Sequence, residues 1–249
     1  MIKSRPYPLW VFFLLLFLNT LVSHAIADAP FISISVDHDD GGRAGDQYMH
    51  DLVTALNANG CNAVSNAEPN NSQMLFDSRP VSIAKKDRTD YQLIARARTL
   101  NGELMVRGAI LVQASTGIEN LGTLRGELIG FVTRKSWSGY RMPLKTLNQA
   151  GIMEMKDKFS FAGNHVGAVS ALLHKDVFAT VTAEPLAKRW AEPNDLSIVA
   201  VSDAVETGGW WIHRSVSEKQ IKNCAQALSK LERSQLKALP AWIDGFEIQ

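Results

Sequence analysis

A strand-to-helix bend near the middle of the chain carries side chains suited to binding an anion. Residues 128–132 (LIGFV) are an apolar run with the length of a buried strand, and a helical pattern follows over 140–148. The start of a helix presents unpaired backbone N–H groups and about half a positive charge. Hydroxyl groups beside it add further donors. The candidate ligand-binding residues of this bend are Ser136, Trp137, Ser138, Gly139 and Tyr140.

A second bend of the same kind lies further along the chain. A strand pattern over 159–161 leads into a helical pattern over 166–174, and Asn164 and His165 lie between the two. If both strands belong to one parallel sheet, both helices begin at the edge where open α/β sheets bind ligands. Neutral backbone dipoles can hold an oxyanion there without a salt bridge. The sequence therefore predicts one anion site shared by two bends.

The same side chains have a purely structural interpretation. Serine and asparagine before a helix are most often N-caps, each worth about 1 kcal/mol to the helix. A histidine at a helix start is also more often structural than ligating. Two such bends together favour a binding site, but both interpretations stay open at this point.

Other chemistries fit the sequence less well. Neither Ser136 nor Ser138 has the flanking glycines of a nucleophile elbow, which disfavours a hydrolase that would use His165 as its base. The motifs of a phosphate-binding loop, a dinucleotide site and a zinc protease are all lacking. Residues 37–40 (DHDD) lack the spacing of a calcium loop and are interpreted as a solvated turn. We therefore expect no enzyme, no cofactor and no metal site.

Composition narrows the class of protein further. With 46% apolar residues, and 26 Lys and Arg against 25 Asp and Glu, the chain is globular and lacks the basic excess that nucleic-acid binding requires. Its two cysteines, Cys61 and Cys224, cannot build a disulfide-rich scaffold. They are either a disulfide pair or two buried thiols.

The N-terminus has the pattern of an export signal. Lys3 and Arg5 precede an apolar run over 9–18, which is too short to span a membrane, and small residues follow at 25–27. We expect residues 1–27 to be a cleaved signal peptide, with an uncleaved anchor as the alternative. No cysteine follows the run to carry a lipid. The expected location is the periplasm of a bacterium with two membranes.

The elements that position the bends can also be anticipated. A helical pattern covers 48–56 and ends at Gly60. Residues 91–98 and 104–114 are predicted to be strands of one hairpin that turns at 101–102 (NG). In the second half of the chain, short buried strands alternate with helices, which indicates an α/β layer.

The residues at both bends resemble a known family. The segments 124–132 (LRGELIGFV), 136–140 (SWSGY) and 150–152 (AGI) are similar to a run in the phosphate/phosphite/phosphonate-type periplasmic substrate-binding proteins of ABC importers. The segment 161–165 (FAGNH) corresponds to the family's Gly-Ser-His before a helix. The resemblance extends over about 90–249.

This resemblance implies a type II periplasmic binding protein, an α/β fold of two lobes that are joined by two crossing strands. We expect lobe 1 to comprise 28–122 plus 206–249 and lobe 2 to comprise 123–205. The implied function is capture of a small phosphonate-, phosphite- or phosphate-like oxyanion between the lobes. The implied partner is an inner-membrane ABC permease, and the protein is expected to be a monomer.

Two positions depart from the family pattern. Trp137 replaces the middle hydroxyl of the family's Ser-Thr-Ser triplet, and Phe178 stands where the family has an acid that meets a ligand ammonium group. These departures favour an alternative function: a ligand-sensing or accessory periplasmic module of the same fold that serves a membrane partner other than an importer.

Overall fold

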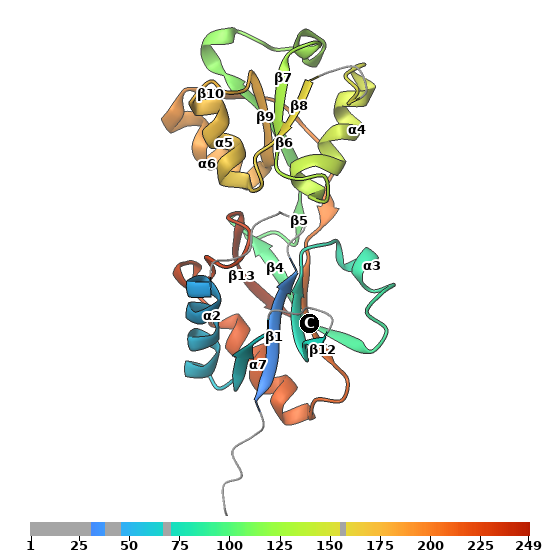
Figure 1. The fold of residues 1–249 in the computed structure, drawn as a ribbon, viewed down its shortest axis with the longest axis vertical. Coiled ribbons are helices and arrows are strands. Elements are labelled where there is room, and N and C mark those ends of the chain that lie inside the picture. The colour runs from blue at the N-terminus through green and yellow to red at the C-terminus, as the bar shows by residue number, and fades with distance from the viewer. Residues whose placement is uncertain (1–30, 38–45, 67–70, 155–157) are drawn as a thin grey trace, which may run out of the picture. The chain divides into compact units, whose positions relative to one another are not determined.

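The computed structural model describes residues 31–37, 46–66, 71–154 and 158–249. The described chain is mixed α/β, as expected, and its strands form two large sheets and a small ribbon (Figure 1). The expected signal peptide and residues 38–40 of the acidic turn lie outside the described residues. Over the described ranges, no helix is long and apolar enough to cross a membrane.

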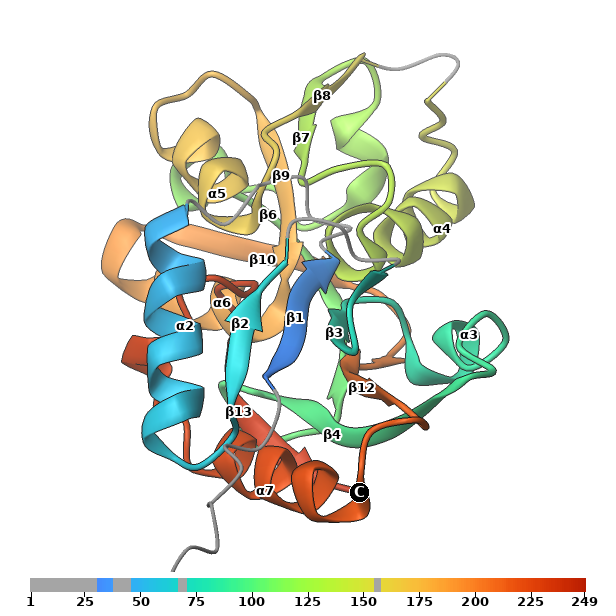
Figure 2. The ribbon, with the colours of Figure 1, turned by 60° about the horizontal axis from the view of Figure 1, so that its bottom comes forward.

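The first lobe is built on a six-stranded sheet in the order β13-β4-β12-β3-β1-β2. Strands β1, β2 and β3 run parallel, whereas β12 runs antiparallel to both of its neighbours, and β13 runs antiparallel to β4. Helices α2 and α7 cover one face, and the short helix α3 lies over the other (Figure 2). The elements of this lobe are β1 (Ile32–Asp37), α2 (Asp46–Ala58), β2 (Ala63–Ser65), β3 (Met74–Asp77), α3 (Val81–Ala84), β4 (Tyr91–Thr99), β12 (Gly209–His213), α7 (Glu218–Ser229), η6 (Arg233–Gln235) and β13 (Ile243–Ile248).

Consecutive tryptophans in β12 fill both cores of the first lobe. Trp210 packs on the α2 and α7 side, with its ring 5.6 Å from Phe76 and 6.1 Å from Phe246. Trp211 packs on the α3 side against Leu75. Side chains alternate across a strand, so two adjacent aromatic residues serve opposite faces of one sheet.

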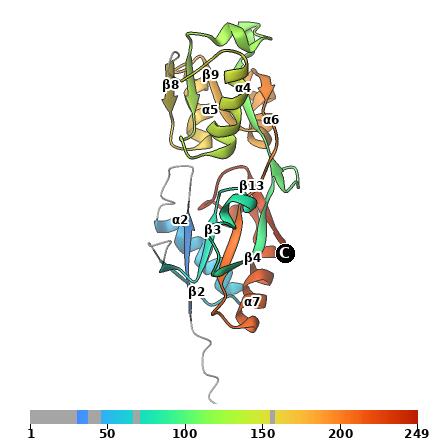
Figure 3. The ribbon, with the colours of Figure 1, turned by 90° about the vertical axis from the view of Figure 1, so that its right-hand side faces the viewer.

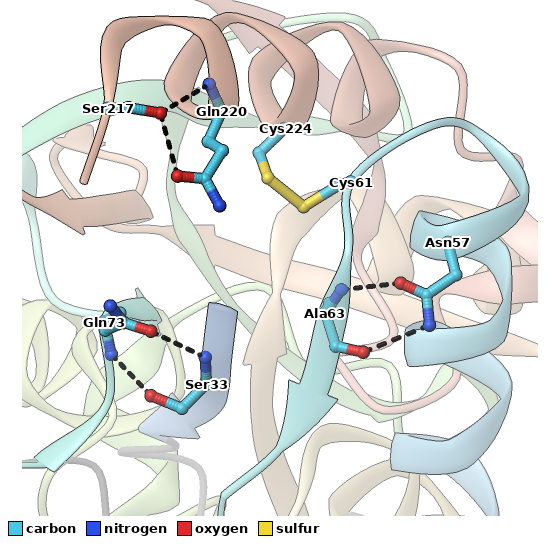
Figure 4. The surroundings of a disulfide bond; sticks show 8 residues. All are labelled: Ser33, Asn57, Cys61, Ala63, Gln73, Ser217, Gln220 and Cys224. Carbon is cyan, nitrogen blue, oxygen red and sulfur yellow. Dashed lines mark hydrogen bonds between the residues drawn. A yellow bond between two sulfur atoms is a disulfide. The ribbon is translucent and has the colours of Figure 1, made fainter. Parts of the chain in front are cut away.

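A disulfide bond joins α7 to the turn that ends α2 (Figure 4). The α2 helix ends before Gly60, which has a φ of +90° as expected for a helix stop, and Cys61 follows. Cys61 and Cys224 are fully buried, and their Cα atoms are 4.5 Å apart, within the range that a disulfide requires. The question that the sequence left open is resolved in favour of the bond.

A buried ion network anchors the loop that follows β3. Asp77 is 1% exposed, and its carboxylate lies 2.7 Å from the guanidinium of Arg79 and 3.0 Å from that of Arg88. Two arginines therefore neutralise one buried carboxylate, and the loop that carries Ser78 is held against the end of the strand.

The second lobe is built on a five-stranded sheet in the order β10-β6-β9-β7-β8. Strands β7, β8 and β9 run parallel, so their carboxyl ends lie at one edge. Helix α4 packs on one face, and α5 and α6 pack on the other (Figure 1); Figure 3 gives a second view of the same elements. The elements are β6 (Gly108–Gln113), η2 (Ala114–Thr116), η3 (Leu121–Leu124), β7 (Leu128–Phe131), η4 (Trp137–Arg141), α4 (Met142–Gln149), β8 (Lys158–Phe161), α5 (His165–Leu173), β9 (Ala179–Ala183), α6 (Glu184–Ala191), η5 (Glu192–Asn194) and β10 (Leu196–Val201).

A two-stranded ribbon, β5 (Met105–Val106) with β11 (Val205–Glu206), lies where the chain passes between the two sheets. The predicted hairpin is wrong: a turn forms at Gly102, but β4 pairs with β12 and β13, whereas β6 pairs with β9 and β10. Because β6 belongs to the second sheet, we propose that the lobes divide at this ribbon rather than near residue 122.

Candidate ligand-binding site

The two bends are neighbours at one edge of the second sheet. Strands β7 and β8 pair in parallel with Phe131 opposite Phe161. Beyond the strands, the Ala162 N–H donates to the Phe131 carbonyl at 2.8 Å, and the Gly163 N–H donates to the Val132 carbonyl at 2.9 Å. The predicted juxtaposition of the bends is therefore confirmed.

The first bend is one turn of π-helix that Ser136 caps. The Ser136 hydroxyl accepts the Gly139 N–H at 3.0 Å, and the Ser136 carbonyl accepts the Arg141 N–H at 2.9 Å. The side chains of Ser136 and Ser138 are buried, at 1% and 3% exposure. The capping interpretation thus holds for Ser136, and the N–H group of Gly139 already has a partner.

Glycine is required at position 139 because the bend packs tightly on its own strand. A Cβ atom at Gly139 would lie 2.3 Å from a methyl group of Val132 and 2.8 Å from the Ser136 hydroxyl oxygen. At Gly108, at the start of β6, a Cβ atom would lie 2.2 Å from the Ser138 carbonyl oxygen. The backbone of the first bend is therefore closely supported from two strands.

The side chain of Tyr140 holds the first bend against the ends of β7 and β8. Its ring packs edge-on against Phe131 at 5.2 Å and Phe161 at 5.5 Å, and its hydroxyl donates to the Glu154 carboxylate. Arg134 also pairs with Glu154 and lies 4.6 Å over the Phe161 ring. The hydroxyl of Tyr140 is thus engaged within the protein, and the residue acts through its position in the bend.

The second bend is capped by Asn164. Gly163 has a φ of +84°, and the Asn164 side-chain oxygen accepts the Gly167 N–H at 2.7 Å at the start of α5. This is the interaction that an N-cap makes, so the capping interpretation also holds here.

His165, the first residue of α5, is anchored to β9. Its side chain is buried, and its Nδ1 atom accepts the Ala183 N–H at 3.1 Å and lies 3.0 Å from the Thr182 hydroxyl. Because Nδ1 accepts a hydrogen bond from a backbone donor, it carries no proton. In the neutral ring the proton is therefore on Nε2, which makes that atom a donor.

A small recess borders the first bend. Its volume is about 10 Å³, which is close to what one water molecule requires. It brings together three of the predicted residues and five others: Ser136, Trp137, Ser138, Ser78, Val106, Glu206, Thr207 and Trp242. Asn164 and His165 do not line it.

The sequence did not point to the residues that line the recess from the first lobe and the ribbon. Each stands at the end of a short element: Ser78 follows β3, Glu206 ends β11, and Trp242 precedes β13. The local pattern at each position is ordinary, because the recess forms only when five segments that are distant in the sequence come together.

The charges around the recess are of both signs. The Ser82 N–H donates to the Glu206 carboxylate at 2.9 Å, and hydrogen bonds from the Ser82 side chain and backbone lower the pKa of Glu206. The guanidinium of Arg141 lies 5.1 Å from the centre of the Trp137 ring. The recess therefore has an ionised carboxylate on its wall and a cation stacked on its tryptophan.

Phe178 takes no part in this site, and the described residues hold no metal candidate. Phe178 packs against the core between β7, β9 and α4 and does not line the recess. Within the described ranges, no group of three or more His, Cys, Asp or Glu side chains is placed to hold a metal ion.

Several solved structures are similar to this chain. A binding protein component of an ABC phosphonate transporter from Pseudomonas aeruginosa is 13% identical, with a TM-score of 0.62 over 89% of this chain and 82% of that chain. PhnD1 from Prochlorococcus marinus, solved with methylphosphonate, is 13% identical, with a TM-score of 0.65 over 88% of this chain and 92% of that chain. A Xanthomonas citri protein solved with ATP is 12% identical, with a TM-score of 0.58 over 87% of this chain and 90% of that chain. Comparison with curated protein sequences gives no match.

These likenesses confirm the expected fold, a two-lobed type II periplasmic binding protein. The profile of the phosphonate ABC-transporter periplasmic substrate-binding proteins matches residues 63–248. Members of this family are periplasmic and bind substrates for transport, so they are not enzymes, as expected. The chain belongs to the family of periplasmic substrate-binding proteins of phosphonate ABC transporters.

Proposed function

We propose that this protein captures a small phosphonate-, phosphite- or phosphate-like oxyanion at the first bend and delivers it to an inner-membrane ABC permease. The single observation that carries the proposal is the juxtaposition of the two bends, each at the carboxyl end of a parallel strand. Family membership supports the class of ligand, and the Prochlorococcus relative was solved with methylphosphonate.

In this proposal Ser138 is the principal hydroxyl donor to the ligand. Its side chain is buried and lines the recess, and the described structure has no hydrogen bond from its hydroxyl to a cap or a core group. Ser136 and Gly139 hold the backbone of the bend, and Tyr140 and Asn164 position the two helices. His165 does not line the recess, and its Nδ1 atom, which accepts the Ala183 N–H, holds the start of α5 against β9.

The proposed ligand is small. Trp137 lines the recess, and an indole there leaves less room than the hydroxyl side chain that the resemblance leads one to expect at this position. We therefore favour an oxyanion with at most a methyl-sized substituent. About three charge-assisted hydrogen bonds of roughly 1.5–3 kcal/mol each account for a micromolar dissociation constant, equivalent to about −8 kcal/mol.

The proposed mechanism is closure of the two lobes about the β5–β11 ribbon. The described chain passes between its two sheets at this ribbon, so a change in a few backbone angles there moves one sheet relative to the other. A ligand that contacts both lobes shifts the population toward the closed state, which is the state that a permease would recognise.

A thermal-shift screen of oxyanions tests the proposal. A ligand at 100 times its dissociation constant stabilises the protein by about 2.7 kcal/mol, which raises the melting temperature measurably. Phosphate, phosphite, methylphosphonate, sulfate and methanesulfonate form the panel. If none of these anions shifts the transition, the proposed function is wrong.

A pair of variants then locates the site. Ser138→Ala should weaken binding about tenfold, because one hydrogen bond to a charged ligand is lost. Asn164→Ala is the matched control, since it removes an N-cap at the neighbouring bend but does not alter the recess. Equal affinities for these two variants would place the ligand elsewhere.

We also propose export with cleavage after Ala27 and a monomeric mature protein. The short apolar run at 9–18 and the small residues at 25–27 support cleavage. Mass spectrometry of the protein from a periplasmic extract should give Asp28 as the first residue, and an intact N-terminus would support an anchor instead. Size-exclusion chromatography with light scattering tests the monomer.

A second function, sensing for a membrane partner other than an importer, is supported by the tryptophan at position 137 and the small size of the recess. Deletion of the gene decides between the two. Loss of uptake of a radiolabelled oxyanion supports the importer receptor. Unchanged uptake together with an altered transcriptional response to the same oxyanion supports the sensor.

A further inference from the structure

Two residues that line the recess from outside the first bend, Trp242 and Glu206, carry polar side-chain groups. Trp242, which precedes β13, is 3% exposed, and its indole Nε1–H has no hydrogen-bond partner within the described part of the chain. Glu206, at the end of β11, lines the same recess. Thr207, their neighbour, instead donates its hydroxyl to the Leu104 carbonyl.

Trp242 differs from the two other buried tryptophans in its position beside the recess. The Nε1 atoms of Trp210 and Trp211 also have no partner among the described residues, and all three rings pack in the apolar cores of the first lobe, Trp242 in the same core as Trp210. Of the three, only Trp242 also lines the recess, together with the buried residues Ser136 and Ser138 and with Glu206. A buried N–H costs about 1–3 kcal/mol when it is unpaired, so a donor retained beside a polar recess is most simply explained by a ligand oxygen.

The Glu206 carboxylate restricts which anion can enter. The Ser82 N–H already donates to it, and the hydrogen bonds of Ser82 favour its ionised form. A second negative charge nearby is repelled, and this repulsion is strong in a partly buried site because screening by water is weak. The repulsion is reduced when the anion carries a proton that it can donate to the carboxylate.

We propose that Trp242 and Glu206 are the specificity-determining residues of the first lobe and select an oxyanion that carries its own hydroxyl group. The indole N–H donates to one ligand oxygen, and Glu206 accepts a hydrogen bond from the protonated oxygen. The class of ligand is a singly charged hydrogen phosphonate or hydrogen phosphite, in preference to a sulfonate of the same shape. This inference rests on the proposed function, because it concerns the far wall of the same site.

The test compares two ligands of equal size and charge. Protein isolated from cells that express the full chain is titrated by calorimetry with methylphosphonate and with methanesulfonate, at a pH where both are singly charged. Only methylphosphonate has a hydroxyl group to donate. The wild type should bind methylphosphonate at least about tenfold more tightly, which is the effect of one hydrogen bond to a charged group.

Two variants, each with a control, test the roles of Glu206 and Trp242 separately. Glu206→Gln should bring the two affinities within about threefold, because the amide can donate to an unprotonated oxygen. Asp203→Asn, an exposed acid paired with Lys145, should leave the preference unchanged. Trp242→Phe should weaken both ligands about tenfold by removing one N–H. Trp211→Phe, equally buried but outside the recess, should change neither affinity by more than about twofold.

The outcomes separate this inference from the proposed function. Binding of both ligands with equal affinity by the wild type would overturn the role of Glu206, as would an unchanged preference in Glu206→Gln. A Trp242→Phe variant that folds normally and binds like Trp211→Phe would overturn the role of Trp242. Binding of no oxyanion by the wild type would instead reject the proposed function, and the inference with it.

Discussion

The two bends of the second lobe are built alike but differ in what surrounds them. In both, a parallel strand ends and a polar side chain caps the next helix. The first bend borders a recess that Glu206 and Trp242 line from outside the bend. The second bend has its histidine anchored to β9. A capped helix start is therefore only a potential anion site, and its surroundings decide whether it is used.

Substitution of the glycines in the two bends should give the largest difference in the free energy of unfolding. Gly139→Ala places a methyl group 2.3 Å from Val132, so we expect a loss of about 3 kcal/mol in the free energy of unfolding. Gly163→Ala has open space around the new Cβ and only the strain of a positive φ, which costs about 1 kcal/mol. Urea unfolding measures both, and equal losses would mean that the first bend is not tightly packed.

Removal of the imidazole should have the next largest effect on stability. His165→Ala leaves the buried Ala183 N–H without its acceptor, which we expect to cost about 2 kcal/mol. Ser138→Ala, in contrast, should change stability by less than about 1 kcal/mol, because its effect is on the ligand. Thermal unfolding in the absence of ligand compares the two. A Ser138→Ala variant as unstable as His165→Ala would indicate a structural role for both.

Replacement of the two N-cap residues should lower the stability of the protein equally but affect ligand binding unequally. Ser136→Ala and Asn164→Ala each remove one N-cap, so each should cost about 1 kcal/mol. Only Ser136 lines the recess, so only its replacement should also weaken the oxyanion. Calorimetric titration of both variants is the measurement. Weaker binding in Asn164→Ala alone would reverse the assignment of the two bends.

The smallest effect concerns the acid opposite the first bend. Hydrogen bonds from Ser82 lower the pKa of Glu206 in the folded protein. Its ionised form therefore adds stability above the unfolded-state pKa of about 4.3, and this contribution is lost as the pH falls through the lower folded value. The advantage of the wild type over Glu206→Gln should shrink between about pH 5 and about pH 3. An advantage that grows on acidification would contradict the direction of the shift.

The parts of the fold that follow local rules were predictable from the sequence. The apolar run before Ser136 forms β7, and α5 begins at His165, after the predicted bend. Both were predictable because a buried strand and a helix cap depend on neighbours in the chain. The stop of α2 at Gly60 follows from the same kind of rule.

The parts that depend on distant pairing were not predictable. The turn at Gly102 forms as expected, yet the strands on its two sides join different sheets, because a turn does not determine the partner of a long strand. The recess was missed for the same reason. Ser78, Glu206 and Trp242 meet only after both halves of the first lobe have assembled.

The bond between Cys61 and Cys224 has a consequence for the integrity of the molecule. The two cysteines are 163 residues apart, and the whole second lobe lies between them in the chain. A protease that cuts any loop of that lobe once therefore opens a ring and does not divide the protein. The nicked protein should migrate as one species on a non-reducing gel and separate into two pieces only after a thiol is added.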